Sequence, residues 1–363
     1  MRVAMDEQIF ALQPYGGISR MFASLARQFF TRPELLVELL PLAAPVINRY
    51  VLDDDFLRER LAVREARSEY RSAARYFTRV QPRRGLDVVH NTFYLPNGLA
   101  SYPGARRVVT VHDMIPEMMP HTRRRLDFLT LKKRYVTNAD HVICVSEATR
   151  SDLESIYGPL RMPVSVIHHG VDSRFSSDAP ALSGIRSPYV LFVGQRGHYK
   201  DAAVLMRAFA NIANEHPDMT LLFVGGGAFT ATERSHLRTL GIDDKTLQTT
   251  LADIHMPSVY AHATAFVFPS RFEGFGIPVL EAFACGTPAI LARSTSLPEV
   301  GGDAALYFEP GDANDLAEHL SRVVSDDHLR RQLSQRGRQR AHMFTWKKAA
   351  EKTAEVYREV INH

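Results

Sequence analysis

Two glutamates, Glu273 and Glu281, lie eight positions apart in the stretch SRFEGFGIPVLEAFACG, with two glycines and a proline between them. Because proline suits the first turn of a helix and glycine suits its end, the stretch predicts a short helix over about 278–285. The first carboxylate then lies in the preceding loop and the second on the first turns of the helix. Since a carboxylate accepts hydrogen bonds from vicinal hydroxyls, the pair predicts a site for a sugar or a ribose.

The same pair of glutamates has two other interpretations. Two carboxylates on either side of a glycosidic bond are the acid and base of a glycosidase, and the spacing alone leaves that role open. The glutamates could also be acids that cap a helix. A glycosidase, however, does not need a diphosphate site, and this chain carries a candidate for one.

Arg196 and Lys200 follow the apolar run YVLFVG, 189–194, which is typical of a buried strand. A helical pattern, DAAVLMRAFANIA, begins directly after them. The N-terminus of a helix offers free N–H groups and the positive end of the helix dipole. A guanidinium and an ammonium beside it therefore predict a diphosphate site, although they can also be two exposed bases. The segment does not match a P-loop, which would read GxxxxGK followed by Ser or Thr.

Two further segments could bring backbone or side chains to a ligand. Gly16 and Gly17 precede an amphipathic helical pattern, and adjacent glycines let the backbone approach a phosphate or a sugar closely. A structural turn explains them as well. His112 ends the strand-like run RVVTVHD, 107–113, where a side chain faces the ligand crevice of a parallel sheet. A structural histidine is the alternative there.

Short apolar runs alternate with helical patterns along the whole chain, which predicts an α/β fold with two doubly wound parallel sheets. A polar, proline-bearing stretch at 173–188 marks the boundary. We expect domains over 1–175 and 188–344, with a helix over 345–363 that returns to the first domain. The predicted strands are 88–90, 107–113, 141–146, 164–170, 189–194, 220–227, 265–270 and 287–292.

Length and composition narrow the class of protein. A chain of 363 residues exceeds one typical core, so two domains are expected. There is no apolar run of 18 residues and no apolar signal sequence, and the two cysteines are expected to be buried free thiols, so we predict a cytoplasmic protein. The acidic run at 53–55 is interpreted as an exposed helix start, and no metal site or other cofactor is predicted.

Basic residues are unevenly distributed. From Arg58 to Arg84 there are nine arginines and three glutamates. A second cluster spans 121–125 and 132–134. These residues form either a solvated face or a surface for anionic lipid headgroups or an acidic acceptor, which would place the protein at the inner face of the membrane. Because aromatics are not interleaved, nucleic acid is not expected as a partner. The stripe at helical spacing is Arg60, Arg64, Arg67, Arg71 and Arg75.

The glutamate pair, in its context, resembles the signature of retaining glycosyltransferases of the GT-B fold, family 4. The resemblance covers almost the whole chain and implies two Rossmann-like domains facing a central cleft, with the C-terminal helix packing back on the N-terminal domain. The matching stretches are GGISR (16–20), VHDMIP (111–116), VSEATRSDL (145–153), HGVD (169–172), VGQRGHYKD (193–201), PSRFEGFGIPVLEAFACGTPAI (269–290) and SLPEVGGDAALYFEPGD (296–312).

The resemblance implies four catalytic residues. Glu273 would bind hydroxyls of the donor sugar, and His112 would face that sugar. Arg196 and Lys200 would hold the diphosphate. One departure from the family pattern is Asp201, where Asn is common: an acid there would weaken a diphosphate site unless it caps the following helix.

The resemblance also implies a wider donor site. The N-terminal glycines would lie near the phosphates, the second glutamate of the pair would bind the ribose, and backbone amides of the intervening loop would bind sugar and phosphate. In addition to the arginine, the lysine and the first glutamate, this set is Gly16, Gly17, Gly274, Phe275, Gly276, Ile277 and Glu281.

The function implied is metal-independent, retaining transfer of a hexose from a nucleotide sugar to a glycan or lipid-linked acceptor in cell-surface polysaccharide or lipopolysaccharide synthesis. The forms of GGISR and VHDMIP resemble the mannosyltransferase-like branch, which favours GDP-mannose as donor. A UDP-sugar-dependent transferase, a sugar-nucleotide epimerase or phosphorylase of the same architecture, and a non-catalytic nucleotide-binding module are the alternatives.

Overall fold

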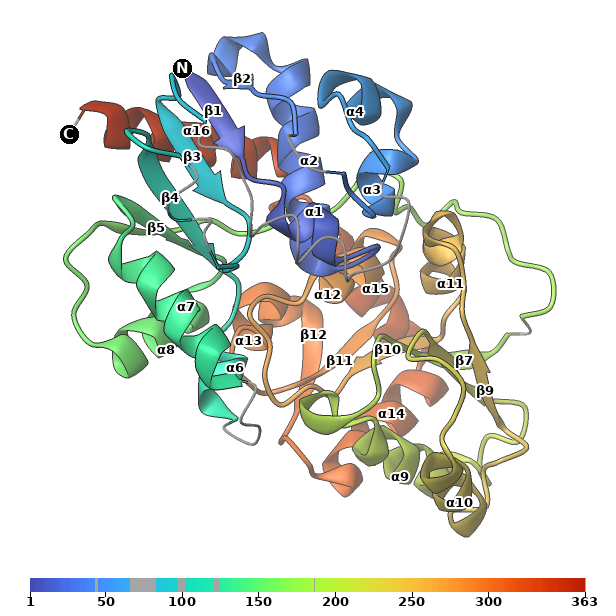
Figure 1. The fold of residues 1–363 in the computed structure, drawn as a ribbon. Coiled ribbons are helices and arrows are strands. Elements are labelled where there is room, and N and C mark those ends of the chain that lie inside the picture. The colour runs from blue at the N-terminus through green and yellow to red at the C-terminus, as the bar shows by residue number, and fades with distance from the viewer. Residues whose placement is uncertain are drawn as a thin grey trace. The chain divides into compact units, whose positions relative to one another are not determined.

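The computed structural model describes residues 1–42, 45–65, 83–96, 99, 102–119, 125–185 and 187–362. The chain forms two compact units, one of Met1–Gly170 with Trp346–His363 and the other of Val171–Thr345 (Figure 1). Each unit contains one sheet of six parallel strands with helices packed around it. The predicted α/β class with two doubly wound sheets is confirmed.

The first sheet has the strand order β2-β1-β3-β4-β5-β6, with every pair parallel. The C-terminal helix α16, Trp346–Asn362, packs against β3, β4 and α2, which confirms that it returns to the first unit. The strands are β1 Arg2–Met5, β2 Glu38–Leu39, β3 Val88–Asn91, β4 Arg106–Val111, β5 His141–Cys144 and β6 Val164–Val166. The helices are α1 Gln8–Leu12, α2 Gly17–Thr31, α3 Arg49–Leu52, α4 Asp55–Arg60, α6 Ile115–Met118, α7 Arg125–Thr137 and α8 Glu147–Tyr157.

The second sheet has the order β12-β11-β10-β7-β8-β9 and is also parallel throughout. In order along the chain this is 6-5-4-1-2-3, the arrangement of a dinucleotide-binding Rossmann sheet. Its strands are β7 Tyr189–Val193, β8 Thr220–Val224, β9 Thr246–Thr249, β10 Ala265–Phe268, β11 Ala289–Ala292 and β12 Ala305–Phe308. Its helices are α9 Ala202–Ile212, α10 Ala231–Thr239, α11 Met256–Ala261, α12 Ile277–Ala284, α13 Leu297–Gly301, α14 Ala313–Ser325 and α15 Asp327–Ala341.

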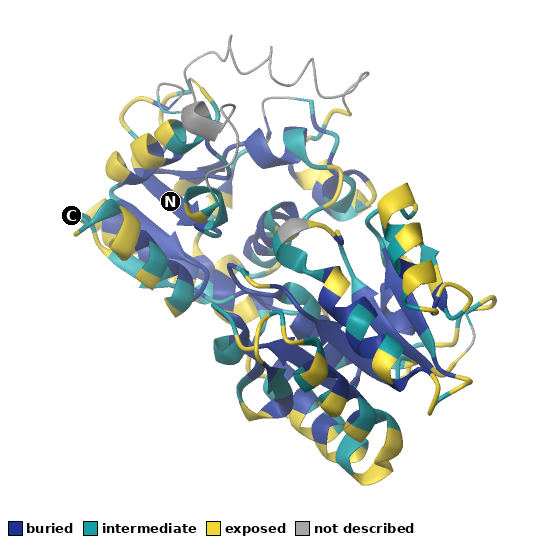
Figure 2. Ribbon diagram, turned by 90° about the horizontal axis from the view of Figure 1, so that it is seen from below, coloured by how far each residue is buried: buried dark blue, intermediate teal, exposed yellow. Residues whose placement is uncertain are grey.

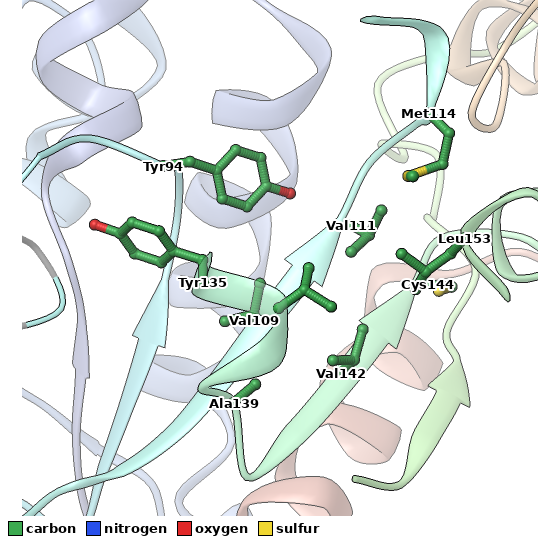
Figure 3. Packing of buried hydrophobic residues seen from close by; sticks show 10 residues of the cluster. Tyr94, Val109, Val111, Met114, Tyr135, Ala139, Val142, Cys144 and Leu153 are labelled. Atoms are coloured by element: carbon green, nitrogen blue, oxygen red, sulfur yellow. The ribbon is translucent and has the colours of Figure 1, made fainter. Parts of the chain in front are cut away.

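The central strands of both sheets are buried, whereas the helices expose their outer faces (Figure 2). In the first unit, Val111 of β4 and Val142 of β5 pack with Tyr135 of α7 and Leu153 of α8 (Figure 3). Burial on both faces explains why the sequence of these strands is continuously apolar. Cys144 belongs to this core, and it and Cys285 are buried free thiols, as predicted.

All eight predicted strands are present, and the described residues contain four further strands that were not predicted. β1 and β2 are short, and β2 has only two residues, too few for a periodic pattern. β9 reads TLQT and lies at the edge of its sheet, and β12 is half-buried at the other edge. Edge strands need less apolar surface, so an interpretation based on buried runs misses them.

The predicted basic stripe is wrong where the structure describes it. Helix α4 ends at Arg60, Ala62 has φ +48°, and the carbonyl of Arg64 accepts a hydrogen bond from Val46 N at 2.9 Å. Arg60 and Arg64 therefore do not share a helix, because a left-handed residue interrupts the backbone between them. The other three members, Arg67, Arg71 and Arg75, lie outside the described residues.

The acidic run 53–55 is a helix start, as predicted: Asp54 is the N-cap of α4 and accepts from Leu57 N at 3.2 Å. Among the described residues, no helix has the length and apolar character needed to span a membrane.

Candidate active site

The order of the second sheet reverses between β7 and β10, which are neighbours in the sheet although β8 and β9 lie between them along the chain. Ligands of open α/β sheets bind at such a switch point, beyond the carboxyl ends of the strands. The loop after β7 carries Arg196 and Lys200, and the loop after β10 carries Glu273. Three residues predicted from sequence thus follow the two strands that define the switch point.

Lys200 and Glu273 form an ion pair in this place. Lys200 Nζ lies 2.5 Å from Glu273 Oε1, and the two side chains are only 19% and 11% exposed. The ammonium also lies 5.1 Å from the centre of the Phe268 ring at the end of β10. The structure therefore brings together a cation suited to a diphosphate and a carboxylate suited to sugar hydroxyls.

The main chain around Glu273 is fixed by the loop that follows β11. Thr295 Oγ1 accepts a hydrogen bond from Glu273 N at 3.0 Å, and Ser296 Oγ lies 3.0 Å from both Glu273 O and Phe275 O. Ser296 is fully buried. These bonds fix the backbone from which the Glu273 side chain projects.

The loop then enters α12 through a glycine that its backbone requires. Gly276 is the N-cap of α12 with φ +104°, a conformation that side-chain-bearing residues rarely adopt. A Cβ at this position would lie 3.1 Å from Leu297 Cδ2, so there is also little space. Glycine has no side chain, so Gly276 cannot accept hydrogen bonds from the first-turn N–H groups of α12. These N–H groups therefore favour an anion.

Glu281 lies on the buried side of α12, which spans Ile277–Ala284 and so begins and ends within one residue of the prediction. Its side chain is largely enclosed, and Glu281 Oε2 accepts a hydrogen bond from Tyr260 Oη at 2.9 Å. Tyr260, on α11, is itself fully buried and contacts Phe175 and Phe266 edge to face. Tyr260 was not predicted, because it lies 21 positions before its partner.

Arg196 forms an ion pair with Glu233, whereas Lys200 pairs with Glu273. Arg196 Nε donates to Glu233 Oε1 at 2.7 Å, and Nη1 and Nη2 donate to the carbonyls of Gly225 at 3.0 Å and Ala228 at 3.1 Å. The guanidinium carbon lies 4.8 Å from the centre of the Phe229 ring. Arg196 as a whole is 7% exposed. Burial raises the pKa of Glu233, but hydrogen bonds from Arg196 and Thr230 outweigh it and hold that pKa below its ordinary value.

Asp201 does not cap α9 with its side chain, but it forms an ion pair with Arg271. It is the N-cap residue of α9 with φ +45° but makes no side-chain cap, and its Oδ2 accepts from Arg271 Nε at 2.7 Å. The acid is therefore not compensated by a helix cap, which the sequence left open, but by an ion pair. Because Arg271 neutralises the acid, the departure from the family pattern does not leave an uncompensated negative charge beside Lys200.

His112 directly follows β4 in the first unit and is 8% exposed. Neither ring nitrogen has a hydrogen-bond partner among the described residues, and Phe22 contacts the ring at 5.9 Å. Burial, reinforced by His169, His90 and Lys132, lowers its pKa well below the ordinary value. The imidazole is therefore neutral at pH 7, with one N–H to donate and one lone pair to accept.

Gly16 and Gly17 begin α2: Gly16 is its N-cap and makes no side-chain cap. This 15-residue helix starts beyond the carboxyl end of β1, the strand at the switch point of the first sheet. Its first-turn N–H groups thus suit an anionic or hydroxylated ligand, as the sequence suggested.

Two features of the first unit were not predicted from sequence. Asp6, beyond β1, accepts from Asn91 Nδ2 at 2.6 Å and from Thr92 N at 2.9 Å, which joins β1 to β3 at the switch point. Lys132, expected to lie on a basic face, is buried, and its Nζ donates to Asp113 O at 2.6 Å and to Glu117 Oε2 at 3.0 Å. It thereby anchors the residue after His112.

Two family models match the chain one after the other. The model described as Glycosyltransferase Family 4 matches residues 15–175, and that described as Glycosyl transferases group 1 matches residues 178–340. An O-antigen chain mannosyltransferase B from Escherichia coli is 29% identical over 289 residues, 73% of this chain and 72% of that protein. A GDP-mannose-dependent alpha-(1-6)-phosphatidylinositol monomannoside mannosyltransferase from Mycolicibacterium smegmatis is 28% identical over 280 residues, 71% of this chain and 72% of that protein.

A solved structure shares the fold. Anabaena Alr3699/HepE in complex with UDP-glucose matches with a TM-score of 0.75 at 16% identity, over 99% of this chain and 100% of that chain. The two doubly wound sheets and the family models for both parts of the chain identify a glycosyltransferase of the GT-B fold. The chain belongs to glycosyltransferase family 4, in its mannosyltransferase-like branch.

Proposed function

We propose that the protein transfers mannose from GDP-mannose to a glycan or lipid-linked acceptor, with retention of configuration and without a metal. The observation that carries the proposal is the Lys200–Glu273 pair at the switch point of the second sheet. In a nucleoside-diphosphate sugar such as GDP-mannose the diphosphate is bonded to the sugar, so such a donor requires adjacent groups for each.

Binding of a donor would change the partners of Lys200 and Glu273. A bound diphosphate would attract Lys200 Nζ, and the Glu273 carboxylate would then accept hydrogen bonds from the sugar. When the bond between the anomeric carbon and the diphosphate breaks, negative charge grows on the leaving group. We expect Lys200 and the first-turn N–H groups of α12 to stabilise that charge, because pre-aimed donors lower the barrier.

The remaining predicted residues have supporting roles in the proposal. Arg196, oriented by Glu233, would add a second cation for the diphosphate, and Glu281 would bind the ribose. His112, being neutral, would form a hydrogen bond to the donor sugar rather than an ion pair with its phosphates. We expect the acceptor hydroxyl to attack from the face that the diphosphate leaves, which retains configuration.

Mannose is favoured because two relatives are mannosyltransferases and one of them is named as GDP-mannose-dependent. A UDP-hexose is the alternative donor, since the protein with the same fold was solved with UDP-glucose. The Escherichia coli relative acts on O-antigen chains, which supports cell-surface polysaccharide as the acceptor class. An epimerase of this architecture would instead convert the donor without an acceptor.

The test is product formation from GDP-mannose and from UDP-glucose in EDTA, with simple mannosides and a polyprenyl-diphosphate-linked sugar as acceptors. Proton NMR of the product reports the configuration of the new bond, and we expect an α-mannoside. A β-linked product would contradict retention. Donor conversion that needs no acceptor would indicate the epimerase.

A variant pair connects this activity to the site. Glu273→Gln should abolish transfer while the protein remains folded, because an amide cannot replace the paired carboxylate. Glu309→Gln is the matched control, since Glu309 forms an exposed pair with Arg293 in the same unit and should retain activity. Wild-type activity in Glu273→Gln would contradict the proposal.

A further inference from the structure

Tyr15 presents an aromatic ring to solvent directly before the two glycines that open α2. The residue is 52% exposed. Its ring meets that of Tyr50, on α3, at a centroid distance of 5.4 Å and an interplanar angle of 80°. Single exposed apolar residues are common on proteins and need no explanation by themselves. The support behind this ring distinguishes it from them.

The loop that carries Tyr15 is fastened to the start of α3. Asn48, which is fully buried, donates from Nδ2 to Gln13 O at 2.8 Å and to Pro14 O at 3.3 Å. The backbone N of Arg49 donates to Pro14 O at 2.9 Å. Three hydrogen bonds therefore fix the two residues that precede Tyr15.

The ring against which Tyr15 packs is also held in place. Arg20, on the first turn of α2, donates from Nη2 to Tyr50 Oη at 3.0 Å, and its guanidinium lies 4.9 Å from the centre of the Tyr50 ring. Tyr15 thus packs against Tyr50, whose side chain is held in place by Arg20. A rigid aromatic loses little conformational entropy when it binds, which is why tyrosine is frequent in binding surfaces.

We propose that Tyr15 is the platform for a pyranose ring of the acceptor. A pyranose has an apolar face of C–H groups that packs on an aromatic ring, and hydroxyls at its edge that suit polar partners such as the Tyr15 hydroxyl. The adjacent N-terminus of α2 adds free N–H groups for sugar oxygens. The inference rests on the proposed transfer, because it assigns the acceptor class of that reaction.

The test compares Tyr15→Ala and Tyr15→Phe with Ile361→Ala, a control whose exposed apolar side chain lies on α16 of the same unit. With methyl α-mannoside as the probe acceptor, Tyr15→Ala should raise the acceptor KM about tenfold, with kcat and the donor KM little changed. Tyr15→Phe should stay within about threefold, because it keeps the ring. The control should behave as wild type.

Other results would overturn the proposal. They are an unchanged acceptor KM in Tyr15→Ala, loss of GDP binding in that variant, or loss of binding to anionic vesicles with an unchanged acceptor KM, which would assign the ring to a membrane. If the wild type transfers no sugar at all, the proposed function fails separately. Saturation-transfer NMR of methyl α-mannoside on wild type and Tyr15→Ala then still decides whether the ring binds a pyranose: a signal lost in the variant supports the platform, and equal or absent signals contradict it.

Discussion

Glu233 holds the guanidinium of Arg196 through two contacts, from Nε at 2.7 Å and from Nη2 at 3.4 Å. The same carboxylate accepts from Thr230 N at 2.7 Å and completes the capping box of α10. One acid therefore both starts a helix and orients a cation after β7. The candidate site therefore includes residues outside the family signature, such as Glu233, which orients Arg196.

Replacement of Glu233 tests that orientation. Glu233→Gln should weaken GDP binding about tenfold, since an amide keeps one acceptor and presents an N–H to a guanidinium that needs two. It should also lower the free energy of unfolding by about 1–3 kcal/mol, because it weakens the cap and leaves a buried cation less well paired. Calorimetric titration and urea unfolding measure both. Tighter GDP binding in the variant would mean that Glu233 competes with the diphosphate instead.

The bond between Tyr260 and Glu281 is expected to support nucleoside binding. Tyr260→Phe removes a hydroxyl from a largely buried carboxylate and should destabilise the protein by about 1–3 kcal/mol. It should also weaken binding of GDP more than binding of pyrophosphate, which has no ribose. Tyr307→Phe, which loses a bond to Gly302 O of 2.8 Å in the same unit, is the control and should bind both ligands normally. Equal losses for both ligands would contradict the ribose role.

The buried Lys132–Glu117 pair should be costly to break. Among the described residues, Lys132→Met leaves the buried Glu117 carboxylate with the Tyr157 hydroxyl, 2.7 Å away, as its remaining partner, and should cost about 3–5 kcal/mol of stability. The double variant with Glu117→Gln should recover part of that loss, since no unpaired charge remains. Urea unfolding, monitored through the single tryptophan, Trp346, in the first unit, measures both. A loss below about 1 kcal/mol in Lys132→Met would contradict the account.

The first unit should lose stability as the pH falls below 6.5. Burial lowers the pKa of His90 and His169 to about 3, so the unfolded chain binds protons there that the folded chain does not. Stability then falls by about 1.4 kcal/mol per pH unit for each histidine. Burial, with Asp6, raises the pKa of Glu7 to about 7, and this opposes the trend between pH 4.5 and 7 because the folded state holds that proton.

The histidine contribution is separable by substitution. Across pH 7 to 5, urea unfolding followed at Trp346 should show a shallower pH dependence for His90→Gln than for wild type. His328→Gln, at an exposed position of the second unit, serves as control. A wild-type stability that rises as the pH falls from 7 to 5 would contradict this prediction.

The sequence was sufficient for the main architecture because most strands are buried on both faces and read as apolar runs. It was insufficient at edges such as β9, where burial is partial and the residues are polar. It also placed five arginines on one helix, because spacing alone does not reveal the left-handed backbone at Ala62.

For the candidate site too, the sequence identified individual residues but not the contacts between them. Lys200 and Glu273 were both identified, but their contact depends on β7 and β10 being neighbours, which is a property of strand order and not of sequence spacing. Thr230 and Glu233 match a capping box that the sequence displays, yet the partner Arg196 is 37 positions away. Pairings of this length become visible only in the fold.

The most direct test of the central claim is the melting temperature of wild type and Lys200→Ala in EDTA with GDP, UDP, ADP and their sugar conjugates. Ligand at 100 times its Kd stabilises a folded protein by about 2.7 kcal/mol. We predict that one nucleoside diphosphate, GDP, raises the melting temperature of wild type selectively, and that Lys200→Ala loses most of the shift. No shift with any nucleotide, or an equal shift in both proteins, would contradict a diphosphate site at the Lys200–Glu273 pair.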